Sequence, residues 1–164
     1  MKNLKIIGRL AFLALAFCFA TACSGDDAGG SGGSGSSLSA KVDGTSFKAQ
    51  IMGQSTTVAL HNGTFYQVTG STADLKTLTI GLFDVTGPGT FQVGPDTDNL
   101  LAFVENNNSY DTGECDGATG TVTVTVVNEE KIEGTFSFTG KSEENGCSGK
   151  TVTEGKFKGV FMQN

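Results

Sequence analysis

The chain contains no Trp, a single His and only two Pro in 164 residues. The absence of Trp removes a side chain well suited to stacking on sugar rings. One His leaves little material for a Ser-His-Asp or Cys-His catalytic arrangement. The apolar run at residues 10–20 is too short to cross a bilayer core, which needs about 20 residues. The sequence therefore predicts neither a membrane-spanning helix nor an enzyme that acts through a nucleophile.

Positive charge is also scarce. The formal net charge is −6, and three of the cations, Lys2, Lys5 and Arg9, lie at the N-terminus. From Cys23 onward there are 8 Lys against 17 Asp and Glu, a net of −9. Such a composition offers no obvious basic face to phosphates, so we expect no nucleic-acid partner.

The N-terminus has the pattern of an export signal. Residues 1–9 are polar and basic, residues 10–20 are apolar, and residues 20–23 read Ala-Thr-Ala-Cys. This pattern predicts a signal peptide over residues 1–22. The last four residues resemble a bacterial lipobox, which implies that Cys23 is acylated, with palmitate as a typical chain, and anchors the protein to a membrane. The alternative is ordinary secretion after an A-x-A cleavage site.

The segment after Cys23 is typical of a tether. Residues 24–37 contain 11 Gly or Ser in 14 positions, which predicts a flexible linker over residues 23–37. Ser24 stands where Asp would resemble an inner-membrane retention signal, which favours the outer membrane. Asp26 and Asp27 resemble a signal for export to the cell surface. We therefore expect an outer-membrane lipoprotein exposed at the surface, the alternative being an inward-facing anchor.

Residues 38–164 show short β-branched and aromatic runs separated by turn residues, with no sustained helical period. They predict one all-β domain, an antiparallel β-sandwich or partly closed barrel of about 8–10 strands. Asn62-Gly63 and Asp43-Gly44 are the strongest hairpin signals. The expected strands are Ser39–Val42, Phe47–Met52, Thr56–Leu60, Thr64–Thr69, Thr77–Phe83, Gly89–Val93, Leu100–Glu105, Thr121–Val127, Gly134–Thr139 and Thr151–Phe161, the last broken near Gly155.

The clearest predicted hairpin joins residues 121–127 to residues 134–139. Their apolar residues all have even numbers, so residues facing each other across the hairpin must have numbers with an even sum. This relation predicts Val124 opposite Phe136 or Phe138, with a loop around residues 129–131. The opposite face then carries a row of hydroxyls, whose members are Thr121, Thr123, Thr125, Thr135, Ser137 and Thr139.

The same register places Cys115 and Cys147 opposite each other at the open end of this hairpin. In an exported protein such a pair predicts a disulfide. Cys18 belongs to the predicted signal peptide and Cys23 to the anchor, so every Cys then has a role.

The disulfide would also gather five carboxylates that repel one another unless they are solvated or bridged by a hard cation such as calcium. These candidate ligands are Asp111, Glu114, Asp116, Glu143 and Glu144. Solvation is the alternative, and no other metal or cofactor is expected. Likewise, the hydroxyl row could bind a glycan, or it could reflect the preference of Thr for the wet face of a sheet.

Four segments carry a resemblance. They are "KVDGTSFKA" (residues 41–49), "GPGTFQVG" (87–94), "GTVTVTVVNEEKIEGTFSFTG" (120–140) and "VTEGKFKGVF" (152–161). Together with the lipobox and tether, they resemble a family of small uncharacterised β-sandwich lipoproteins of Bacteroidota. The resemblance implies a fold and a location and brings no catalytic residues.

These observations favour a non-catalytic, membrane-anchored module that binds an extracellular polymer or a protein. Two alternatives remain at this point. One is a lipocalin-like carrier whose Phe residues line a cavity for an apolar ligand. The other is a purely structural protein of the cell envelope.

Overall fold

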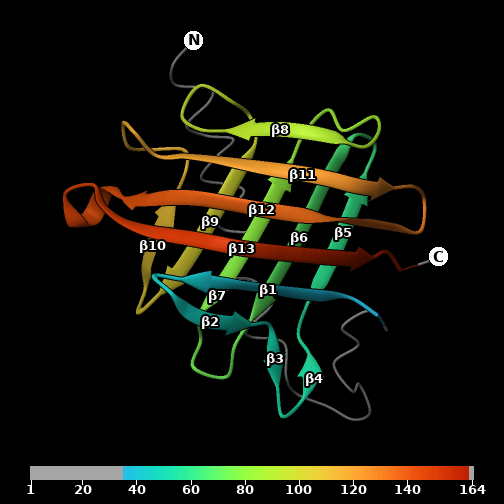
Figure 1. Ribbon diagram of the computed structural model, residues 1–164, viewed down its shortest axis with the longest axis horizontal. Helices are drawn as coiled ribbons and strands as arrows, with labels where there is room; N and C mark the ends of the chain where they lie inside the picture. The colour runs from blue at the N-terminus through green and yellow to red at the C-terminus, as the bar shows by residue number, and fades with distance from the viewer. Residues whose placement is uncertain (1–34, 163–164) are drawn as a thin grey trace. The chain divides into compact units, whose positions relative to one another are not determined.

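The computed structural model describes residues 35–162, which fold almost entirely into β-strands (Figure 1). The predicted signal peptide, Cys23 and most of the predicted linker lie outside these residues. The elements are β1 (Ser37–Val42), β2 (Thr45–Lys48), β3 (Gln50–Ile51), β4 (Gln54–Ser55), β5 (Val58–Asn62), β6 (Phe65–Ser71), β7 (Thr77–Leu82), β8 (Gly89–Val93), β9 (Leu100–Glu105), β10 (Asn108–Asp111), β11 (Thr119–Val127), β12 (Lys131–Ser142), the 3₁₀ turn η2 (Glu143–Asn145) and β13 (Ser148–Val160).

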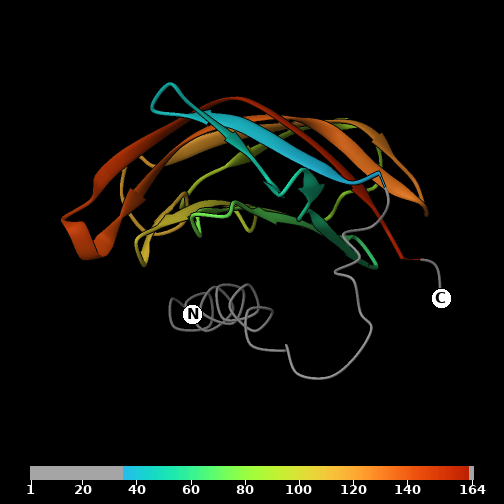
Figure 2. The ribbon, with the colours of Figure 1, turned by 90° about the horizontal axis from the view of Figure 1, so that it is seen from below.

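Eleven strands form one antiparallel sheet that curls over on itself. We call β2, β1, β13, β12, β11 and β8 the front layer, and β10, β9, β7, β6 and β5 the back layer. The two layers cross in Figure 1 and are seen edge-on in Figure 2. The sheet passes from one layer to the other where Asp111 of β10 pairs with Lys141 of β12. This curled half-barrel confirms the predicted all-β, antiparallel class.

The space between the layers is filled by the inward-facing residues of both. Leu78, Leu101, Val122 and Val152 have no exposed surface and belong to one continuous apolar cluster. Of the Phe residues that a carrier would direct into a cavity, Phe103 and Phe157 pack in this cluster, and Phe91 lies against it. Phe65 and Phe83 instead contact each other, with ring centroids 4.7 Å apart and planes inclined by 37°, and Phe83 is 40% exposed. Within residues 35–162, no helix has the length and apolarity that crossing a membrane requires.

Both predicted hairpins form. Val42 pairs with Thr45 across Asp43-Gly44, whose positive φ angles of 47° and 81° suit a tight turn. Asn62 pairs with Phe65, and the Gly63 between them has a φ of 62°. Local turn chemistry therefore determined these connections.

Two strand predictions need correction. The expected strand Phe47–Met52 is divided into β2 and β3, and Ala49 lies between them with its N–H donated to the Leu38 carbonyl. Strand β10 was not predicted, since its sequence Asn-Ser-Tyr-Asp lacks apolar alternation. The signal for it was the Asn106-Asn107 pair, whose φ angles of 51° and 64° make the turn between β9 and β10.

The register predicted for β11 and β12 is also wrong. Phe136 lies opposite Val122, and Val124 lies opposite Gly134. A bulge at Thr125 then shifts the pairing by one residue. The bulge directs Val127 toward the core in place of Val126, the residue expected there. Facing residues have numbers with an even sum only up to the bulge. The alternation of apolar residues in the sequence does not reveal where the bulge lies.

Candidate functional site

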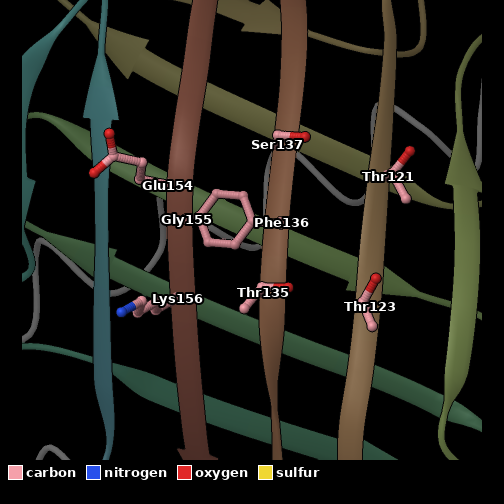
Figure 3. Close-up of a pocket in the computed structure, with 8 residues that line it drawn as sticks. All are labelled: Thr121, Thr123, Thr135, Phe136, Ser137, Glu154, Gly155 and Lys156. Atoms are coloured by element: carbon pink, nitrogen blue, oxygen red, sulfur yellow. The ribbon is translucent and has the colours of Figure 1, made fainter.

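The outer face of the front layer carries a shallow hollow of about 350 Å³. Strands β11, β12 and β13 line it (Figure 3). The lining residues are Thr121, Thr123, Thr135, Phe136, Ser137, Glu154, Gly155 and Lys156. We call this feature the outer hollow.

Hydroxyl groups form one side of the outer hollow. Thr121 pairs with Ser137, and Thr123 pairs with Thr135, so the four side chains stand in two adjacent cross-strand pairs. Thr121 donates to Gln92 Oε1 over a long 3.5 Å. Within residues 35–162, the hydroxyls of Thr135 and Ser137 make no hydrogen bond. They are therefore available to donate to, or accept from, a ligand.

The floor of the outer hollow depends on a glycine. Gly155 lies opposite Phe136, whose ring covers the inner side of the glycine (Figure 3). A Cβ atom at position 155 would lie 2.5 Å from the Phe136 carbonyl oxygen and 2.7 Å from two ring carbons. Gly155 therefore leaves room for the Phe136 ring on the inner side of the sheet, directly beneath the hollow.

A bulge places Glu154 at the opposite wall. Phe136 pairs with Gly155 but Phe138 pairs with Val152, so β13 carries one extra residue opposite Ser137. The break predicted near Gly155 does not occur, because β13 runs from Ser148 to Val160 without interruption and only its pairing register shifts there. Glu154 has a φ of 53° and is the only non-glycine residue within a described strand that adopts a positive φ. This backbone costs about 1–2 kcal/mol for an L-residue, so local propensity does not explain a Glu here.

The Glu154 carboxylate is engaged from one side. Its Oε1 accepts from the Lys41 ammonium at 2.7 Å, and both side chains are well exposed. Lys156 follows two residues along the same face, and both Glu154 and Lys156 extend from β13 toward β1 (Figure 3). The outer hollow therefore presents hydroxyls along one side and charged groups along the other.

Four of the six predicted hydroxyl residues line the outer hollow, and two do not. Thr125 lies at the bulge and donates to the Glu133 carbonyl, while Thr139 pairs with Thr119 and Thr151 farther along the strands. Sequence reasoning missed Glu154 and Lys156. The signal for Glu154 was the Gly155 that interrupts the strand pattern of β13, since a glycine inside a strand often marks a bulge. Lys156 faces outward by ordinary strand alternation.

The predicted disulfide between Cys115 and Cys147 is present, with the two Cα atoms 5.8 Å apart. The predicted register was not the reason for it. Residues 143–146 turn back at the end of β12, and the Cys147 N–H donates to the Ser142 carbonyl. This turn brings Cys147 beside the β10–β11 connection that holds Cys115.

The calcium hypothesis is not supported by the geometry. Among residues 35–162, no three His, Cys, Asp or Glu side chains come together as metal ligands. Asp111 is buried and accepts from the Gly113 N–H, whereas Glu114, Asp116, Glu143 and Glu144 are exposed. The Lys141 ammonium also donates to the Asp116 carbonyl at 2.6 Å, which places a cation within the proposed cluster.

His61, the single His of the chain, contributes to a turn. Its Nε2 lies 2.7 Å from the Gly63 carbonyl oxygen. Its ring stacks on that of Tyr66, with centroids 4.4 Å apart and planes inclined by 11°. These contacts stabilise the β5–β6 hairpin.

Comparison with known proteins finds one family. A family model described as a domain of unknown function (DUF6252) matches residues 35–162, the range that the structure describes. Neither curated proteins nor solved structures give a significant match.

Proposed function

The chain belongs to the DUF6252 family, and from this premise we propose that it is a membrane-anchored, non-catalytic lipoprotein that binds a carbohydrate polymer outside the cell. The lipobox-like residues 20–23 support the anchor, and the acidic pair Asp26-Asp27 supports a location on the surface of the outer membrane. The likeness to lipoproteins of Bacteroidota supports the same location. The family match begins at residue 35, after the predicted anchor and most of the predicted tether.

The observation that carries the proposal is the outer hollow. It gathers four hydroxyls on a three-stranded surface, together with a carboxylate and an ammonium. Hydroxyl groups both donate and accept, which suits the mixed donors and acceptors of a sugar. A shallow, open surface also admits the middle of a polymer, whereas a closed pocket admits only its end.

The interior of the domain supports a surface site over the carrier alternative. The inward-facing side chains of both layers form one packed cluster, so an apolar ligand would have to displace core residues. A protein partner and a purely structural envelope role both predict no retardation in the following experiment, which therefore separates each of them from the proposed function.

Binding is tested by affinity gel electrophoresis of the folded domain against a panel of soluble polysaccharides. The double variant Thr121→Val/Thr135→Val removes two hydroxyls from the outer hollow. Thr125→Val/Thr139→Val is the matched control, because it makes the same chemical change on the same strands outside the hollow. We expect retardation by at least one polysaccharide that only the first variant loses. Equal behaviour of both variants, or no retardation of the wild-type protein by any polysaccharide, contradicts the proposed site.

The location is tested separately in cells. Labelling with a palmitate analogue should depend on Cys23, so Cys23→Ser should abolish it. Added protease should degrade the protein on intact cells as well as on permeabilised cells. Protection on intact cells excludes surface exposure and favours an inward-facing anchor.

A further inference from the structure

Two lysine side chains within residues 35–162 have no ion-pair or hydrogen-bond partner among those residues. Residues 35–162 contain eight Lys and 15 Asp or Glu, a net of −7, so a Lys has many acids available to it. Five of these lysines form ion pairs, and Lys141 donates to the Asp116 carbonyl. Within the described residues, only the side chains of Lys48 and Lys156 form neither an ion pair nor a hydrogen bond.

These two lysines lie on the same face of the front layer. Ser39 of β1 pairs with Lys48 of β2 on one side and with Lys156 of β13 on the other. Two strand spacings therefore separate them, about 10 Å. Both are exposed, because their neighbours Phe47 and Phe157 face the core.

The row that contains them continues into the outer hollow. Lys156 pairs with Thr135, Thr135 with Thr123, and Thr123 with Thr90 of β8. Cross-strand partners share a face, so these side chains form a line across six strands. At about 4.8 Å per strand, the line from Lys48 to Thr90 is about 24 Å long. A linear polymer can follow such a line across the strands.

The acids near this row are already neutralised. Glu154 is paired with Lys41, and Glu133 lies 2.8 Å from Lys131 and 3.9 Å from Lys158. The charge that remains on this part of the surface is therefore positive, although the domain as a whole is acidic. The amino-acid composition alone does not reveal this positive surface, because it gives the number of charges and not their positions.

We propose that the ligand of the outer hollow is an acidic polysaccharide, whose carboxylate or sulfate groups pair with Lys48 and Lys156 while its hydroxyls bond to the Thr and Ser side chains. This inference rests on the proposed function and names its substrate class. The row from Lys48 to Thr90 has only two unpaired ammonium groups among its hydroxyls. It therefore suits a polysaccharide whose charged groups are likewise separated by hydroxyls. The acidic remainder of the domain disfavours a nucleic acid, in which every nucleotide carries a phosphate.

The test measures the affinity of the folded domain for polygalacturonate and chondroitin sulfate as acidic probes, for dextran as a neutral probe, and for single-stranded DNA as a polyanion without this sugar chemistry. Lys48→Gln and Lys156→Gln are compared with Lys76→Gln. The control makes the same change of charge at a back-layer turn, where Lys76 pairs with Asp74. All variants are checked for unchanged thermal unfolding.

We expect an acidic polysaccharide to bind best. Each of Lys48→Gln and Lys156→Gln should weaken its binding about fivefold and should lower the slope of log K against log salt by about 1. Lys76→Gln should change neither quantity. Glu154→Gln should strengthen binding of the same probe, because it releases Lys41 from its ion pair.

Three results would overturn the inference. One is binding of the acidic probes that is insensitive to both lysine variants. Another is dextran binding as tightly as the acidic probes, which leaves the proposed function intact but assigns it a neutral polymer. The third is DNA binding as tightly as the acidic polysaccharides. If no polysaccharide binds at all, the proposed function fails together with the inference.

Discussion

The ammonium of Lys150 lies 2.8 Å from Oε1 of Glu105, which connects the beginning of β13 in the front layer to the end of β9 in the back layer. The same ammonium lies 3.1 Å from Asp43 Oδ2 and 5.8 Å from the centre of the Tyr110 ring. Hydrogen bonds to Glu105 and then to Asp43 raise the pKa of Lys150. One cation therefore joins two turns and both layers at this end of the domain.

Replacing Lys150 by Met should lower the free energy of unfolding by about 1–2 kcal/mol, because the half-buried Glu105 loses its partner. The measurement is chemical denaturation monitored by circular dichroism. Lys41→Met is the control, since the pair it forms with Glu154 is much more exposed and should contribute less. An equal effect of the two variants would contradict the role assigned to Lys150.

Acid should weaken the domain through Asp43. The Thr151 N–H donates to its Oδ1, and this bond, followed by those from Lys150, lowers the pKa of the Asp43 carboxyl. A lowered pKa in the folded state contributes stability above the unfolded value near 4, and this stability is lost as the pH falls through the folded value. Asp43→Asn keeps the left-handed turn and the acceptor oxygen. Its unfolding free energy should therefore depend less on pH below about 4 than that of the wild type.

Removal of the Cys115–Cys147 disulfide should lower the unfolding free energy by about 3–4 kcal/mol, since the bond joins residues 32 apart in the sequence. Cys115→Ala/Cys147→Ala and chemically reduced wild-type protein should show similar losses in denaturant titrations. A thiol assay on the denatured, unreduced domain should find neither Cys free. Reactive thiols there would show that the bond does not form.

Replacement of Thr57 is expected to stabilise the domain. Its side chain has no exposed surface, and within the described residues its Oγ1 has no hydrogen-bond partner. Thr57→Val removes this unsatisfied hydroxyl with little change of shape and should raise the unfolding free energy by about 1–2 kcal/mol. Thr112 is equally buried, but its Oγ1 accepts from the Leu101 N–H, so Thr112→Val should destabilise instead. Changes of the same sign in both variants would count against this explanation.

Gly155→Ala should lower the unfolding free energy by about 2 kcal/mol or more, because the new Cβ meets the Phe136 carbonyl and ring. Gly149→Ala, in the same strand, is the control. The new Cβ of this variant would have no neighbour closer than 3.5 Å, so the denaturant midpoint of its unfolding should hardly change. A Gly155→Ala variant as stable as the control would show that Phe136 can move aside.

The carbohydrate proposal depends on features that sequence reasoning could reach only in part. The hydroxyl row follows from the alternation of Thr with Val and Phe, since side chains in a strand alternate between two faces. Glu154 joins it only because β13 bulges, and Lys41 pairs with Glu154 from 113 residues away. Lys48 and Lys156 lie two strands apart on one face only because β1 pairs with both of their strands. No local pattern encodes such neighbours.

The sequence by itself determined the all-β class, the hairpins marked by Asp43-Gly44 and Asn62-Gly63, and the two cysteines that remain once those of the predicted signal and anchor are set aside. Side-chain period, turn conformation and the number of available thiols are local or compositional properties. Tertiary structure alone decided the β11–β12 register, the order of strands in the curled sheet and the meeting of free lysines with the hydroxyl row. Those features depend on long-range strand pairing and on bulges, which shift the register by one residue without changing the apolar pattern that the sequence displays.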